Sequence, residues 1–235
     1  MTTPVRVALI GMGRMGRALD ALASAHECEV VSRFGRPTRE GSINRESLNG
    51  AEVALEFSTP TTTFDNAMAC LRAKCPVVVG TTGWNDSAAE FERAVHANQC
   101  AALVAPNFAL GVQLFLGIAH DAARRLRNVP AFAPHLLETH HSAKLDAPSG
   151  TALAVQETVA RELVHNVPIT SVRVGSVPGT HELIFDAPFE QIRLVHVARD
   201  RRVFADGALV AARWLVGRRA AAVYSLRDVL QGSVA

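Results

Sequence analysis

The chain has 235 residues, 49% of them apolar, which is enough for a buried core in one large domain or two of ordinary size. Its 24 basic and 22 acidic residues leave a formal charge of +2 and form no long block of one sign, so composition gives no reason to expect a nucleic-acid partner. No stretch approaches the roughly 18 apolar residues of a membrane span, and the N-terminus lacks a secretory pattern. We therefore expect a globular, cytoplasmic protein that binds a small molecule.

The four cysteines, Cys28, Cys70, Cys75 and Cys100, lack the C-x-x-C spacing of zinc sites and redox motifs. Scattered single cysteines in a chain of this size usually behave as small buried apolar residues. We expect them to be reduced and structural.

Short aliphatic runs alternate with helical patterns through the first hundred residues. The runs are apolar on both faces, which is typical of strands buried in a parallel sheet. Between them, apolar residues recur at helical spacing, as at Met15, Leu19 and Leu22. Strand and helix in alternation predict an α/β domain with a Rossmann-like, doubly wound parallel sheet. The expected strands are 5–10, 28–34, 52–57, 76–80 and 101–105.

The pattern changes after residue 107. A long helix, a strand and a second helix are followed by three strand-like segments without intervening helices, which predicts a second, α+β domain with an antiparallel or mixed sheet. A further helix from about 203 leads into a tail that could return to the first domain. The expected elements are a helix at 108–127, a strand ending in "HLLETHH", a helix at 150–165 and strands near 169–174, 180–185 and 190–198. We expect residues 1–107 plus about 208–235 to form the first domain and residues 108–207 the second.

A glycine-rich segment, "GMGRMG", directly follows the first expected strand and precedes a helix. Such glycines let the backbone turn tightly and approach a pyrophosphate, whose charge is met by the amides of the helix N-terminus. A purely structural turn is the alternative, but the strand-turn-helix context favours dinucleotide binding. The predicted cofactor-binding residues here are Gly11, Met12, Gly13, Arg14, Met15 and Gly16.

The end of the second expected strand bears on the choice of cofactor. NAD-specific proteins usually carry an acid there to bind the ribose 2'-hydroxyl. This chain has Arg33 and Arg36 instead, and arginine suits a 2'-phosphate. We expect NADPH to be favoured, with NADH as the alternative; surface arginines without a ligand are the other interpretation.

Two more loops follow the fourth and fifth expected strands, at the strand ends where ligands of this architecture bind. They read "GTTGW" and "APNFALG". Their joint placement predicts further cofactor contacts from Gly80, Thr81, Thr82, Ala105, Pro106, Asn107 and Phe108.

The stretch "ETHHSAKLDAPSGTA" concentrates the chain's polar chemistry. Ser149 is a plausible N-cap, so the N–H groups of Gly150, Thr151 and Ala152 would face an anion such as a carboxylate. His140, His141 and Lys144 would supply proton donors and positive charge beside it. A metal is the rival interpretation for the histidines, but adjacent side chains on a strand point to opposite faces and no other ligand cluster is evident, so we expect none.

These motifs, in this order, resemble the 4-hydroxy-tetrahydrodipicolinate reductase family, also called dihydrodipicolinate reductases, of lysine and diaminopimelate biosynthesis. "GMGRMG", "GTTG", "PNFALGV", "E-x-H-H-x-x-K-x-D-A-P-S-G-T-A" and "FADGALVAARWLVG" carry the resemblance over nearly the whole chain. The chain departs from the family in a shorter glycine loop, in "EFSTP" where many members have Asp-Phe-Thr, and in a missing segment after about 170.

The resemblance implies hydride transfer from a nicotinamide to a small cyclic dicarboxylate, and a homotetramer. It also implies that residues 1–107 plus about 208–235 form the dinucleotide-binding domain and that residues 108–207 form the substrate-binding and oligomerisation domain. It implies that His140 and Lys144 are the catalytic proton donors, and that His141, Ser149, Gly150 and Thr151 bind substrate. Two alternatives stay open from the residues alone: another two-domain Rossmann oxidoreductase, and an inactive sensor that binds NADPH and a partner protein.

Overall fold

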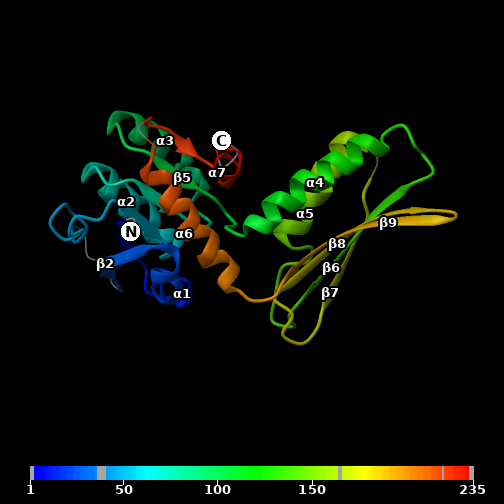
Figure 1. Ribbon diagram of the computed structural model, residues 1–235, viewed down its shortest axis with the longest axis horizontal. Helices are drawn as coiled ribbons and strands as arrows, with labels where there is room; N and C mark the ends of the chain where they lie inside the picture. The colour runs from blue at the N-terminus through cyan, green and yellow to red at the C-terminus, as the bar shows by residue number, and fades with distance from the viewer. Residues whose placement is uncertain (1–2, 36–40, 164–165, 219, 233–235) are drawn as a thin grey trace. The chain divides into compact units, whose positions relative to one another are not determined.

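The computed structural model describes residues 3–35, 41–163, 166–218 and 220–232, and the chain divides into two compact units. The first comprises Met1–Ala109 and Phe204–Ala235, and the second Leu110–Val203 (Figure 1). The sequence boundaries at 107 and about 208 differ slightly from these. The chain passes from the first unit into the second just before helix α4 (Leu110–Leu126), and it returns to the first unit within the first turn of helix α6 (Arg202–Val216).

The first unit contains a six-stranded sheet in the order β10-β5-β4-β3-β1-β2, with every pair parallel. This confirms the predicted Rossmann-like sheet. Pairing of β10 with β5 returns the C-terminal tail to this sheet. The strands are β1 (Val5–Ile10), β2 (Cys28–Phe34), β3 (Val53–Glu56), β4 (Val77–Val79), β5 (Ala102–Val104) and β10 (Val223–Tyr224).

Both faces of this sheet are buried. Ala54, Val77 and Val79 face a core shared with α2 and α3, while Leu9 and Leu55, which point the other way, are equally inaccessible. The four cysteines are buried and unpaired, as predicted. The helices of this unit are α1 (Arg14–Leu22), α2 (Pro60–Arg72), α3 (Ala88–Ala97), α6 and α7 (Leu226–Gln231), with 3-10 turns at Ser24–His26 and Asn85–Ser87.

The second unit is built on a four-stranded sheet in the order β7-β6-β8-β9. The β6–β7 pair is parallel and the other two pairs are antiparallel, so the predicted mixed sheet is confirmed. Its elements are α4, β6 (Ala133–His140), α5 (Gly150–Leu163), β7 (Ile169–Arg173), β8 (Gly179–Ala187) and β9 (Glu190–Ala198).

Helices α4 and α5 lie together on one face of this sheet (Figure 1). Phe115 and Val155 from the helices pack with Leu136, Leu183 and Phe185 from the strands. Side chains alternate along a strand, so the remaining apolar positions point to the face that these two helices leave uncovered. That open face carries Val172, Val174, Val195 and Val197, which are 36%, 51%, 53% and 55% exposed.

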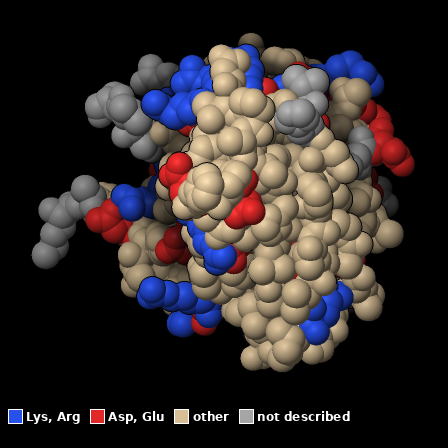
Figure 2. Space-filling view, turned by 90° about the vertical axis from the view of Figure 1, so that its right-hand side faces the viewer, with Lys and Arg blue, Asp and Glu red and all other residues tan. Residues whose placement is uncertain are grey.

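The surface seen from the side of the second unit carries little charge. Most of the described surface in this view belongs to uncharged residue types, with separate groups of basic and of acidic side chains among them (Figure 2). Within the described ranges, no helix combines the length and hydropathy needed to span a bilayer.

Candidate active site

The glycine loop of the first unit leaves room for a ligand at one position. Gly11 has φ +93°, and a Cβ there would lie 2.4 Å from the carbonyl oxygen of Phe57; a Cβ on Gly16 would lie 2.1 Å from the Gly11 oxygen. Packing therefore requires both glycines. A Cβ on Gly13, in contrast, would meet no heavy atom within 4 Å. The space beside Gly13 is consistent with close approach of a pyrophosphate.

Helix α1 begins immediately after this loop, at Arg14. No side chain caps its N-terminus, and the carbonyl oxygen of Met12 accepts a hydrogen bond from Arg17 (3.2 Å). An uncapped helix start favours a bound anion, since the first-turn amides otherwise lack protein partners. Met15 is half-buried in that turn. The loop and helix together fit a dinucleotide.

Arg33 lies near the end of β2, as predicted, but it is already engaged. Its guanidinium donates two hydrogen bonds to Asp20 of α1, from Nε at 2.9 Å and from Nη2 at 2.7 Å. The hydrogen bond from Arg33 lowers the pKa of Asp20. Arg36, the other predicted cofactor residue, lies outside the described residues.

The "GTTGW" loop after β4 rests on a buried carboxylate that the sequence did not single out. Glu56, at the end of β3, is fully buried and accepts hydrogen bonds from Thr81 Oγ1 (2.7 Å) and Asn66 Nδ2 (3.2 Å). The Thr81 hydroxyl is thus directed into the protein. Gly80 packs against the Phe57 ring, and Thr82 is exposed.

The loop after β5 is partly buried. Ala105 and Phe108 are 4% and 2% exposed, so their side chains pack inside the protein, and Phe108 contacts the Phe57 ring. Pro106 is exposed, and Asn107 Oδ1 accepts the Ala109 N–H (2.8 Å). Among the predicted cofactor residues of these two loops, Thr82 and Pro106 are the exposed ones.

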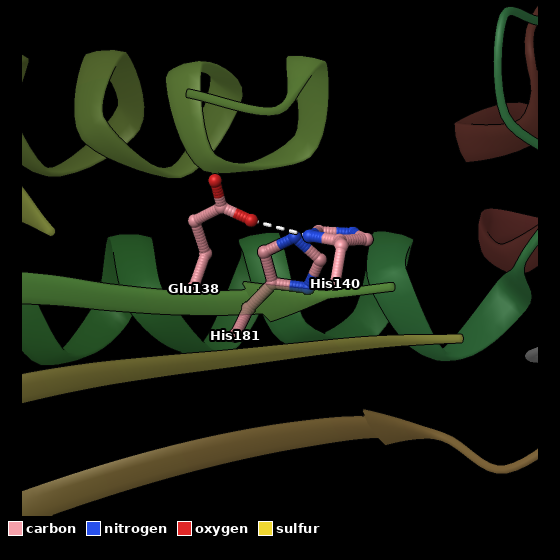
Figure 3. Close-up of side chains that lie close together, drawn as sticks. All are labelled: Glu138, His140 and His181. Atoms are coloured by element: carbon pink, nitrogen blue, oxygen red, sulfur yellow. Dashed lines mark hydrogen bonds and ion pairs between the residues drawn. The ribbon is translucent and has the colours of Figure 1, made fainter. Parts of the chain in front are cut away.

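In the second unit, His140 and Glu138 lie two residues apart on β6 and therefore point to the same face of the sheet (Figure 3). Glu138 Oε2 is hydrogen-bonded to His140 Nδ1, and Glu138 Oε1 accepts a hydrogen bond from Arg173 Nη2 (2.6 Å). Burial raises the pKa of Glu138, but hydrogen bonds from Arg173, Ser171 and His140 outweigh it and lower the pKa to about 2. Burial lowers the pKa of His140 despite the neighbouring carboxylate.

His181 of β8 lies beside this pair, with its ring centroid 5.1 Å from that of His140. Burial, with the charges of His140 and His196, lowers its pKa to about 4, so it is neutral at pH 7. Glu138, His140 and His181 lie close enough to hold a metal ion by spacing alone. However, Arg173 already neutralises Glu138, and the Glu138–His140 hydrogen bond uses the facing atoms. These contacts favour a hydrogen-bonded cluster over a metal site.

Lys144, in the loop after β6, is 22% exposed and is held by Asp146, whose carboxylate oxygens lie 2.7 and 2.8 Å from Nζ. The Lys144 hydrogen bond lowers the pKa of Asp146. The main-chain carbonyl of Asp146 in turn accepts a hydrogen bond from Arg173 (2.6 Å). Arg173 therefore joins the Lys144 loop to the Glu138–His140 pair.

Ser149 caps α5 as predicted, but one expectation for this turn was wrong. The Ser149 hydroxyl accepts the Ala152 N–H (3.2 Å), so this amide is not available to an anion. The same hydroxyl lies 3.2 Å from His181 Nε2, and Ser149 is only 2% exposed. Gly150 and Thr151 are the first two residues of the helix, at the positive end of its dipole.

His141 lies one residue beyond β6, and its Nε2 is 2.5 Å from Arg201 Nη2. Arg201 was not predicted from the sequence, although the basic run "ARDRR" at the end of β9 is a signal that could have indicated it. Glu138, Arg173 and His181 were also not predicted as members of the site. The structure brings His140, Lys144 and the start of α5 together through Glu138 and Arg173.

Comparison with known proteins follows the same division into two parts. Residues 5–108 match the family model described as dihydrodipicolinate reductase, N-terminus, and residues 111–230 match that described as dihydrodipicolinate reductase, C-terminus. Proteins named 4-hydroxy-tetrahydrodipicolinate reductase from Thiobacillus denitrificans and Gluconobacter oxydans are 35% and 36% identical over 96% of this chain, and over 98% and 97% of their own lengths.

A solved structure supports the fold. The dipicolinate-bound dihydrodipicolinate reductase from Paenisporosarcina sp. TG-14 aligns with a TM-score of 0.78 at 23% identity, over 94% of this chain and 97% of that one. Because both family models match in order and relatives above 30% identity span nearly the full length, the chain belongs to the dihydrodipicolinate reductase family.

Proposed function

We propose that this protein uses a nicotinamide cofactor to reduce 4-hydroxy-tetrahydrodipicolinate to tetrahydrodipicolinate in lysine and diaminopimelate biosynthesis. The observation that carries the proposal is the grouping of His140 and Lys144 with the N-terminus of α5, in a family whose members bear this name. The net reaction takes one hydride and one proton and releases one water.

The substrate carries two carboxylates, and the second unit offers two kinds of positive site for them. One is the start of α5, at Gly150 and Thr151, where the helix dipole favours negative charge. The other is the His141–Arg201 pair, because guanidinium groups bind carboxylates through paired hydrogen bonds. Binding of dipicolinate, a planar dicarboxylate, by the Paenisporosarcina relative supports this arrangement.

The proton comes from His140 or Lys144. When bound, the nicotinamide supplies the hydride, and the substrate ring then needs a proton. Lys144 is charged and held at the site by Asp146, and His140 is held by Glu138. Placing two proton carriers in one cluster allows transfer without recruitment of a proton from solvent.

We propose NADPH as the preferred cofactor, with NADH as the alternative. The support is Arg33 near the end of β2, held by Asp20, with no acid between it and Gly35. A guanidinium suits a 2'-phosphate better than a 2'-hydroxyl.

We further propose that the enzyme is a cytoplasmic homotetramer. Four buried, unpaired cysteines suit a reducing compartment. The exposed valines on the open face of the second unit's sheet suit burial against another subunit, because exposed apolar side chains gain stability when they are removed from water.

The direct test is a spectrophotometric assay. Purified protein is mixed with NADPH and the freshly made product of dihydrodipicolinate synthase, and loss of NADPH absorbance is followed. We expect turnover that depends on both the synthase product and the protein. NADPH loss that is unchanged when the synthase product is withheld, or no loss at all, would refute the proposed reaction.

A further inference from the structure

Glu138 is the buried centre of the substrate unit's polar cluster. It is fully inaccessible, and its two oxygens contact groups from different parts of the chain. Oε2 contacts His140 Nδ1, while Oε1 accepts hydrogen bonds from Arg173 Nη2 at 2.6 Å and from the Ser149 N–H at 3.3 Å. One carboxylate therefore connects the histidine with the cap of α5.

The charge state of Glu138 determines which nitrogen of His140 carries a proton. Arg173 pairs with Glu138 and favours its ionised form. An ionised carboxylate accepts hydrogen bonds and donates none, so His140 Nδ1 must be the donor. The neutral ring then has its lone pair on Nε2, and the charged ring has its exchangeable proton there.

Gly179 leaves space next to that nitrogen. A Cβ at this position would lie 3.0 Å from His140 Nε2, so any larger residue would press on the nitrogen. The absence of a side chain at Gly179 therefore keeps β8 from pressing on the nitrogen that carries the lone pair in this tautomer.

We propose that Glu138 is a positioning residue that locks His140 with Nδ1–H bound internally and Nε2 as the atom that exchanges a proton with substrate, and that couples this ring to the carboxylate-binding start of α5. This inference rests on the proposed function, since it assigns a role within that reaction. Glu138 touches no substrate in this scheme and acts through His140 and Ser149.

Four charged or titratable groups face His140 from the surrounding elements: Glu138 on β6, His181 on β8, Arg173 on β7 and Lys144 in the following loop. The Glu138 carboxylate raises the pKa of His140, whereas Lys144 and Arg173 lower it. Removing the Glu138 charge should therefore move the His140 titration to lower pH. A purely structural role for Glu138 would not produce this shift in a folded variant.

The first experiment uses the unmodified protein. Histidine ¹⁵N NMR reports the tautomer of each ring, and His140→Gln identifies the His140 signals. We expect neutral His140 to be protonated on Nδ1 in the wild-type protein. A neutral ring protonated on Nε2 would overturn the inference without any Glu138 variant and without an activity measurement.

The second experiment compares Glu138→Gln with Glu182→Gln. Glu182 pairs with Arg193, lies next to His181 on β8 and points to the opposite face of the same sheet, so it is a matched control. For Glu138→Gln we expect kcat to fall roughly tenfold or more, the KM for NADPH to stay unchanged, and the His140 titration midpoint to move to lower pH. Glu182→Gln should retain the wild-type values.

The two proposals fail in different ways. A wild-type protein that does not reduce the synthase product contradicts the proposed function, whatever the NMR result. An active wild-type enzyme whose Glu138→Gln variant keeps its kcat and its His140 titration contradicts only the role of Glu138.

Discussion

The structure adds a condition to the predicted role of Lys144 as a proton donor. Its ammonium is paired with Asp146, so proton donation requires the substrate to replace Asp146 as its partner. We expect Lys144→Ala to lower kcat by about a hundredfold or more, with the KM for NADPH little changed, because a lost general acid affects the chemical step. The melting temperature should change little, since a partly exposed ion pair contributes less than about 1 kcal/mol.

Asp146→Asn is the informative comparison for Lys144. It breaks the same ion pair but keeps the ammonium. If Lys144 only braces the loop, both variants should lose activity equally. If it donates a proton, Asp146→Asn should keep most of the turnover that Lys144→Ala loses. Rates and melting temperatures measured on the same preparations separate these outcomes.

The arginines near the end of β2 lead to a prediction about cofactor choice. Replacing Arg33 and Arg36 with alanine should weaken NADPH binding by about 1 to 3 kcal/mol, the range for charge-assisted hydrogen bonds, and leave NADH nearly unchanged. Titration of each cofactor by calorimetry measures the difference. Arg72→Ala, at the end of α2, is a control in an exposed arginine of the same unit. Equal losses for both cofactors would count against 2'-phosphate recognition.

Residues in the central motif could be predicted because their chemistry is local, whereas their partners could not. His140, Lys144 and Ser149 fall within one short stretch. Arg173 is 35 positions from Glu138, and only folding of β7 beside β6 brings the two together. Glu138 itself had an available signal: its spacing of two from His140 on a strand places both side chains on one face.

At the scale of elements, hydrophobic pattern predicted the strands and helices well. The runs were long and apolar, so their existence was clear, but β3, β4 and β5 each proved one residue shorter at both ends than expected. Helix α5 begins at the predicted residue because Ser149 caps it. The pairing order of β6 to β9 was not predictable, since no local pattern specifies which neighbour a strand takes.

The open face of the β6–β9 sheet provides a test of assembly. Replacing both Val195 and Val197 with aspartate places two charges at exposed apolar positions, and we expect the proposed tetramer to dissociate because a buried interface does not tolerate unpaired charge. Sedimentation velocity measures the change in mass, and circular dichroism verifies folding. Ile118→Asp, at an exposed apolar position on α4, is the control. A double variant that sediments like the wild-type protein would exclude this face as the interface.

At the scale of the whole molecule, each unit has its own core and its own predicted task. The predicted cofactor residues lie in the unit formed by both chain ends, and the proposed proton donors and carboxylate sites lie in the inserted unit. The inserted unit also contains two buried histidines, His140 and His181, and the half-buried His196. Burial lowers the pKa of all three, so acid should affect this unit in particular.

The sign of this pH effect follows from where the protons bind. The folded pKa of His181, about 4, lies below its ordinary value of 6.5, so the unfolded chain binds a proton first as pH falls. The contribution of His181 to the free energy of unfolding is therefore fully present above pH 6.5 and is lost as the pH falls toward 4. The pKa shift corresponds to about 3 kcal/mol. Glu138, whose folded pKa is about 2, acts in the same direction at lower pH.

We accordingly expect the melting temperature to fall between pH 7 and pH 4, and His181→Asn to reduce this dependence even if it lowers stability at pH 7. His140, His196, Glu138 and Lys144 surround His181 and remain in the variant, so the reduction isolates the contribution of His181. His96→Asn, in the last turn of α3 in the other unit, should keep the wild-type dependence. Scanning calorimetry at half-unit steps of pH measures the slopes. Identical slopes for wild type and His181→Asn would mean that the buried imidazole gains its proton without unfolding. The predicted link between the His181 pKa and the loss of stability in acid would then be wrong.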